Sequence, residues 1–73
     1  MTFDEAKHAI KPFGKFVGME IDTIAETDEG LLHLDWLVGW FARRPIIYPH
    51  FQLALRTYLD DPAIKAELER IVR

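Results

Sequence analysis

Acidic and histidine side chains occur twice at a spacing of four residues, which places two potential ligands on one face of a helix. The pairs are Asp4 with His8 and Glu29 with His33. Carboxylate oxygen and imidazole nitrogen both bind metal ions, but a protein site needs at least a third ligand. No pattern marks His50 as that ligand. We therefore interpret both pairs as surface contacts and expect neither a metal nor another cofactor.

Nucleophilic catalysis finds little support in the composition. The 73 residues include no cysteine and no serine, so the usual thiol and hydroxyl nucleophiles of acyl transfer are missing. The adjacent carboxylates Asp60 and Asp61 precede Pro62, an arrangement more typical of a helix start than of acid–base catalysis. We therefore expect a protein that is not an enzyme.

A cassette of aromatic residues, glycines and a lysine occupies residues 12–18, with the sequence PFGKFVG. Gly14 and Gly18 favour tight turns, because glycine adopts positive φ without steric cost, and Lys15 then lies at the tip. The remainder of a P-loop motif is missing, so this is no nucleotide-binding loop. Cationic and aromatic side chains on a turn can still contact a phosphate backbone and stack on a base. The residues predicted to do so are Lys11, Lys15, Phe16, Arg43 and Arg44.

A different interpretation makes the same cassette purely structural. Phe13 and Phe16 would then belong to the core, and the lysines would only keep the turn soluble. The formal net charge of −3 favours this view, because an acidic chain is a poor electrostatic match to nucleic acid. Six carboxylates and no lysine or arginine occupy residues 19–35. These carboxylates repel a nucleic acid unless they lie on another face of the molecule.

The cassette and a later segment together resemble a known family. Pro12-Phe13-Gly14-Lys15 and Gly18 are followed by Leu34, Trp36 and Leu37. This pattern is similar to that of the small C-terminal module of exodeoxyribonuclease X-like proteins, which also occurs as stand-alone phage and bacterial proteins. The match covers about residues 11–38. Exonuclease chemistry in such proteins resides in a separate catalytic domain, so the resemblance implies an accessory role in nucleic-acid metabolism without nuclease activity.

The expected fold is one α+β domain, residues 1–73, in which a short two-stranded β-hairpin packs against three to four helices. Residues 11–14 and 19–25 are the expected strands, because apolar and polar residues alternate in the second. Thr2 and Glu5 form a capping-box pattern for a short first helix. Further helices are expected from about residue 27 to before Pro45, from Pro49 to about residue 59, and from Pro62 onward, with residues 46–48 extended.

The expected helix before Pro45 has apolar residues on two nearly opposite faces. One stripe contains Leu31, Leu34, Leu37, Val38 and Phe41, and the other contains Leu32, Trp36 and Trp40. Two interpretations remain open. Either the hairpin and the later helices sandwich this helix, with Trp36 packed on the hairpin, or Leu32, Trp36 and Trp40 form a surface for a protein partner.

These observations predict a non-catalytic accessory module that contacts nucleic acid weakly through a lysine-tipped aromatic hairpin. The alternative is a phage-type protein-binding adaptor or inhibitor that uses the aromatic helix face and the acidic segment. Expected partners are therefore a nucleic acid and a protein or a second copy of the chain. We expect a cytoplasmic protein without membrane contact, because no signal-peptide pattern and no apolar run of spanning length occur.

Overall fold

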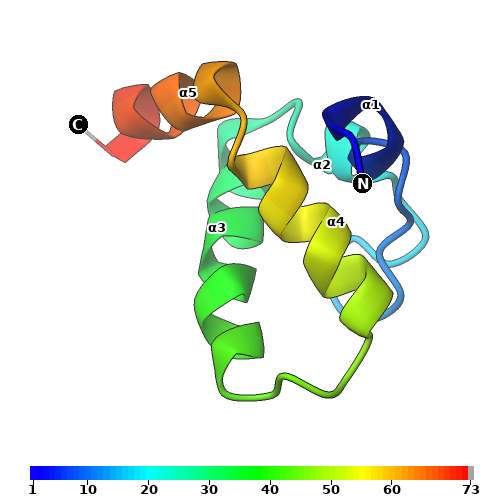
Figure 1. Cartoon of the computed structure of the whole chain (residues 1–73). Helices are drawn as coiled ribbons and strands as arrows, with labels where there is room; N and C mark the ends of the chain where they lie inside the picture. Colours follow the sequence, from blue (N-terminus) through cyan, green and yellow to red (C-terminus); the bar gives the residue numbers. More distant parts are fainter. Residues whose placement is uncertain (73) are drawn as a thin grey trace.

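The computed structural model describes residues 1–72, and within this range it contains five helices and no β-sheet. The helices are α1 (Phe3–Ala6), α2 (Ile21–Ile24), α3 (Asp28–Ala42), α4 (Pro49–Leu59) and α5 (Pro62–Val72). Figure 1 shows α3 and α4 side by side, with α1 and α2 near the C-terminal end of α4 and α5 leading away from that end. The predicted α+β fold class is therefore wrong, because the domain is helical.

The predicted β-hairpin is replaced by a closed loop. One antiparallel bridge joins Ile10 and Glu20, and the neighbouring amide of Lys11 donates to the Met19 carbonyl at 2.9 Å. Residues 11–14 do not form a strand, and residues 21–24 form a helical turn. In a strand, Ile21 and Ile24 would point to opposite faces, whereas one helical turn directs both into the core. Burial of this pair therefore explains why the helix forms.

The turn chemistry of the cassette is as predicted. Gly14 and Gly18 have φ angles of +68° and +83°. Phe16 also has a positive φ, of +65°, which is uncommon for a residue with a side chain. These three residues curl the chain tightly enough to return Gly18 to Lys11, whose carbonyl accepts from the Gly18 amide at 2.9 Å.

Side-chain capping fixes the starts of three helices where the sequence predicts them. The capping box of Thr2 and Glu5 is present, and the Thr27 hydroxyl accepts from the Gly30 amide at 3.0 Å. Asp61 accepts from the Ala63 amide at the start of α5. Helix α4 begins at Pro49 without a side-chain cap, and the predicted starts of α1, α3, α4 and α5 are all confirmed.

The connection between α3 and α4 departs from the prediction. Residues 46–48 form a turn instead of an extended segment, and Tyr48 has a left-handed φ of +46°. Gln52 is buried, and its side-chain amide donates to the carbonyls of Arg44 and Ile47 at 3.0 and 2.6 Å. A buried side chain thus satisfies the backbone of the turn and holds the C-terminal end of α3 in place.

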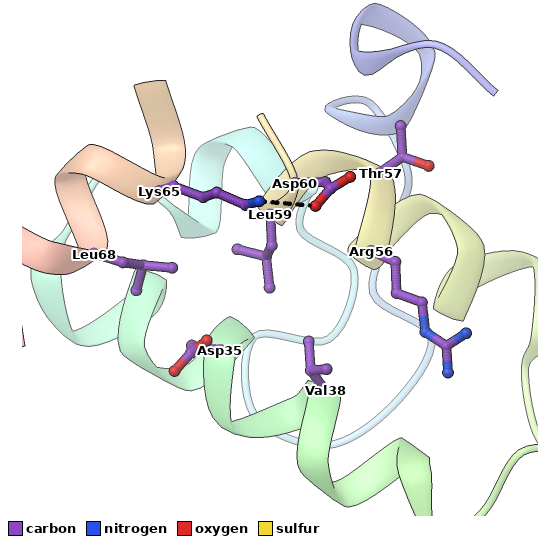
Figure 2. A pocket seen from close by; sticks show the side chains of 8 residues that line it. All are labelled: Asp35, Val38, Arg56, Thr57, Leu59, Asp60, Lys65 and Leu68. Carbon is purple, nitrogen blue, oxygen red and sulfur yellow. Dashed lines mark ion pairs between the residues drawn. The ribbon is translucent and has the colours of Figure 1, made fainter. Parts of the chain in front are cut away.

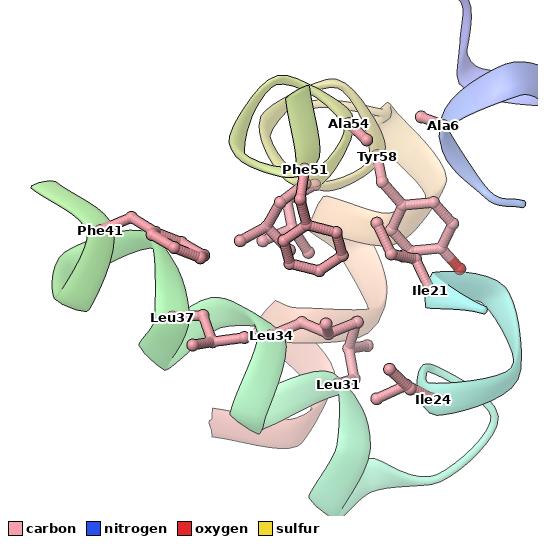
Figure 3. Close-up of a cluster of buried hydrophobic side chains, with 12 residues drawn as sticks. Ala6, Ile21, Ile24, Leu31, Leu34, Leu37, Phe41, Phe51, Ala54 and Tyr58 are labelled. Atoms are coloured by element: carbon pink, nitrogen blue, oxygen red, sulfur yellow. The ribbon is translucent and has the colours of Figure 1, made fainter. Parts of the chain in front are cut away.

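The hydrophobic core lies among α1, α2, α3 and α4 (Figure 3). The predicted stripe of α3 that begins at Leu31 faces the core, with Val38 half-buried. Helix α5 contributes only the half-buried Ile64, Leu68 and Ile71, and Val72 is 68% exposed. The core consists of Ala6, Ile21, Ile24, Leu31, Leu34, Leu37, Phe41, Phe51, Ala54, Leu55, Tyr58 and Leu59.

Candidate functional site

A groove of about 330 Å³ lies along the C-terminal half of α3 and its exit. Its lining residues are Trp36, Gly39, Trp40, Arg43 and Arg44. Positions 36, 40 and 43 follow the four-and-three spacing that aligns side chains on one helix face. We call this feature the aromatic–arginine groove. It combines four residues singled out from the sequence as two separate groups, the cationic set and the aromatic set.

Trp40 forms a fixed wall of the groove. Its ring lies 5.3 Å from the ring of Phe13, and the guanidinium carbon of Arg44 lies 4.2 Å from its centroid. Arg44 also donates to the Trp40 carbonyl at 3.1 Å. Trp40 is therefore half-buried by its own chain, and the loop packs against Trp40 where one prediction placed Trp36.

Trp36 is 59% exposed, so the predicted packing of this residue on the hairpin is wrong. Its indole stacks on the imidazole of His33, with ring centroids 5.7 Å apart and an interplanar angle of 26°. Leu32, one turn earlier on the same face, is 39% exposed. The second apolar stripe of α3 therefore has two parts. Trp40 packs against the loop, whereas Leu32 and Trp36 are in contact with solvent.

His33 holds the ring of Trp36 in place by packing against one of its faces. Its ring packs edge-on against Phe16, with centroids 5.4 Å apart, and its Nε2 is buried without a hydrogen-bond partner among the described residues. Burial, together with the positive charges of Lys11 and Lys15, lowers the pKa of His33. The imidazole is therefore neutral near neutral pH. Sequence reasoning missed this role, although the three-residue spacing of His33 and Trp36 indicates their contact.

Lys11 is 1% exposed and does not reach the surface, which removes it from the predicted set of phosphate contacts. Its ammonium donates to the Phe13 carbonyl and lies 4.4 Å from the centroid of the Phe13 ring. Burial lowers its pKa. The aliphatic part of the side chain fills the loop and its charged end is satisfied locally, so Lys11 is a structural residue.

Lys15 is exposed at the turn, as expected, but it has a partner. Its Nζ lies 2.6 Å from Oε1 of Glu29, and this hydrogen bond lowers the pKa of the carboxyl. Phe16 is half-buried and packs on His33 instead of pointing into solvent. The predicted contacts therefore separate into an exposed arginine pair and a lysine that already bonds to α3.

The carboxylates of the acidic segment differ in their distance from the arginines. Glu29 and Arg43 are fourteen residues apart, a separation of about 21 Å along a helix at 1.5 Å per residue. The Debye length is only about 8 Å at physiological salt. Asp28 is also paired with Arg70 at 3.1 Å. Repulsion by Asp28 and Glu29 is therefore largely screened at the arginines, whereas Asp35, which lies eight residues and about 12 Å before Arg43 along the helix, still opposes an anion in the groove.

A second cavity, of about 560 Å³, lies between α3, α4 and α5 (Figure 2). Val38, Leu59 and Leu68 form its apolar part, and the ion pair of Lys65 with Asp60, 3.1 Å long, lies at its edge. Its charged residues, Asp35, Arg56, Asp60 and Lys65, comprise two of each sign. The balance of charge gives this cavity no preference for an anionic ligand.

Neither of the carboxylate–histidine pairs of the sequence belongs to a metal-binding cluster among the described residues. His8 contacts Glu20 at 3.0 Å, and Asp4 pairs with Lys7 at 3.2 Å. Among residues 1–72, no group of three or more histidine, aspartate or glutamate side chains is placed to hold a metal ion. Within the same range, no helix has the length and apolar character required to cross a bilayer.

Comparison of the chain with protein-family models, curated proteins and solved structures gives no match. The resemblance to the exodeoxyribonuclease X-like module therefore stays a prediction from residues 11–38.

Proposed function

We propose that this protein is a non-catalytic accessory module that binds single-stranded nucleic acid weakly through the aromatic–arginine groove. The observation that supports this proposal is the presence of an exposed indole, Trp36, and two exposed guanidinium groups, Arg43 and Arg44, in one groove. Guanidinium groups bind phosphates, and an indole face stacks on an unpaired base. The resemblance of residues 11–38 to a module of nucleic-acid metabolism points in the same direction.

The distribution of charge allows this binding but keeps it weak. Arg43 forms no ion pair within residues 1–72, so its guanidinium is available to a ligand. Arg44 packs on Trp40 but has further N–H donors that can reach a phosphate. Two phosphate contacts on a chain of net charge −3 provide limited attraction. We therefore expect measurable affinity mainly at low salt.

Fluorescence anisotropy with a labelled oligothymidylate at low salt tests this function. We expect binding by the wild-type protein and clearly weaker binding by Arg43→Gln. Arg56→Gln is the matched control, because Arg56 is an exposed arginine that lines the other cavity. Equal loss in both variants would indicate a nonspecific charge effect, and no binding by the wild type would refute the proposal.

A second candidate function is a protein-binding adaptor, and the exposure of Leu32 and Trp36 on one face of α3 supports it. Adjacent exposed apolar side chains are typical of interfaces. A second copy of the chain is one such protein partner. Sedimentation velocity at high protein concentration is expected to show a dimer that Leu32→Glu dissociates. A monomer at all concentrations excludes self-association through this face.

A further inference from the structure

The single exposed tryptophan of the groove suggests what part of a nucleic acid it recognises. We infer that the aromatic–arginine groove accepts one unpaired base, stacked on the outer face of Trp36, and that His33 positions the indole for this contact. This inference rests on the proposed function and deepens it. It specifies a strand with a free base as the ligand, in preference to a phosphate backbone alone or a closed duplex.

The two tryptophans of the groove are not equivalent. Trp40 already packs against Phe13 and Arg44, 5.3 and 4.2 Å from its ring centroid, and it is half-buried. Trp36 is 59% exposed and has His33 as its only aromatic neighbour among the described residues. A ring with one occupied side and one free side can accept a base by stacking. Only Trp36 offers this position within the groove.

The indole of Trp36 is held in place before any ligand arrives. It stacks on His33, which packs against Phe16, so the three rings form a continuous row. Phe16 is fixed in turn by the tight loop, in which it has a positive φ. Because the row is already ordered, stacking a base on its outer end requires little additional loss of conformational entropy. His33 is therefore a positioning residue, since it acts on the base only through Trp36.

Gly39 leaves room for the base. It lies three residues after Trp36 on the same helix face, and a Cβ placed on it would meet no atom within 4 Å. Glycine is unfavourable within a helix, and no packing contact at this position requires it. The open space instead extends the groove between Trp36 and the arginines. A larger side chain other than proline at position 39 would fill this space while improving helix propensity.

Tryptophan fluorescence provides a direct test. In a Trp40→Phe background, Trp36 is the only tryptophan, and phenylalanine keeps an aromatic ring against Phe13. The probes are an oligothymidylate and an abasic oligomer with the same number of phosphates. We expect the oligothymidylate to quench Trp36 and to bind about tenfold more tightly than the abasic oligomer. Trp36→Leu, read by anisotropy, and Gly39→Leu, which blocks the space without harming the helix, are expected to remove this tenfold difference.

The outcomes separate this inference from the proposed function. Salt-sensitive binding of both oligomers with equal affinity and no quenching would overturn the base-stacking inference and leave the proposed function standing. If neither oligomer binds, both the base-stacking inference and the proposed function are overturned. For His33, we expect His33→Ala to reduce the difference between the oligomers and His33→Phe to restore it, with abasic binding unchanged. Retention of the full difference in His33→Ala would refute the positioning role.

Discussion

Gly30 packs directly against the backbone of Ile24. A Cβ on Gly30 would lie 1.8 Å from the Ile24 carbonyl oxygen and 2.8 Å from the carbonyl carbon, so no side chain fits at this position. The close approach brings α2 against the first turn of α3. It also allows Ile24, which is 1% exposed, to enter the core beside Leu31. The junction of these two helices therefore depends on this glycine.

Gly30→Ala is expected to destabilise the protein by about 3 kcal/mol or more, because the backbone of α2 must move away from α3. Gly39→Ala, in the same helix but facing open space, is the matched control. Helix propensity predicts that it stabilises the protein by about 1 kcal/mol. Urea unfolding measures both changes. Similar effects of the two substitutions would contradict the close contact of Gly30 with Ile24.

The closed loop makes a second prediction about glycines. Gly14→Val and Gly18→Val are each expected to lower the free energy of unfolding by about 1 kcal/mol or more, because φ is positive at both positions. At Gly18 the effect is one of backbone strain alone, since a Cβ there meets no atom within 4 Å. Gly39→Val is the control in a helical conformation. Unchanged denaturation midpoints for both loop variants would contradict the turn geometry.

The short-range features of the fold could be predicted from the sequence, since each depends on residues close together in the chain. The capping box of Thr2 and Glu5 and the start of α5 at Pro62 are examples. Residues 21–24 were mispredicted because alternation over a few residues does not distinguish a strand from one turn of helix. The choice between strand and helix depends on tertiary packing. Ile21 and Ile24 both have to enter the core, and only a helical turn points both side chains to the same side.

In the candidate site, too, the residues could be predicted from the sequence but their long-range packing could not. The sequence identified Trp36, Trp40, Arg43 and Arg44, but assigned the aromatic and cationic residues to different partners. The sequence analysis also grouped Lys11 with the arginines, because neither composition nor spacing indicates that a lysine is buried inside its own loop. Long-range packing of Phe13 on Trp40 determines which tryptophan stays exposed. No local pattern contains that information.

Lys11 and Lys15 are expected to respond differently to the same substitution. Lys11→Ala removes a buried aliphatic chain and the hydrogen bond to the Phe13 carbonyl, and we expect a loss of about 2 kcal/mol of stability. Lys15→Ala removes one exposed ion pair with Glu29, whose contribution solvent screening keeps small. Thermal unfolding of the two variants measures this difference. Equal stability of both would show that Lys11 has no structural role.

Protonation of His33 is expected to make the fold less stable in mild acid. Its pKa in the folded protein is below the ordinary value of 6.5, because of burial and the charges of Lys11 and Lys15. The unfolded chain therefore binds the proton more readily. The stability that depends on a neutral His33 is fully present above about pH 6.5. It is lost as the pH falls from there through the pKa of His33 in the folded protein.

The pH dependence of unfolding, compared between the wild type and His33→Phe, isolates this contribution. The variant is expected to lose less stability than the wild type below pH 6.5, because phenylalanine cannot take up the proton. His8 and His50 are present in both proteins, so the comparison isolates the change at position 33. Parallel pH profiles for the two proteins would contradict the burial of a neutral imidazole.

The salt dependence of binding to single-stranded DNA tests the central claim most directly. If Arg43 and Arg44 each contact one phosphate, a plot of log affinity against log salt concentration has a slope of about −1.4, at 0.7 per contact. The double variant Arg43→Gln/Arg44→Gln is expected to give a slope near zero, and Arg56→Gln is expected to keep the wild-type slope. A wild-type slope that the double variant leaves unchanged would contradict nucleic-acid binding in the aromatic–arginine groove.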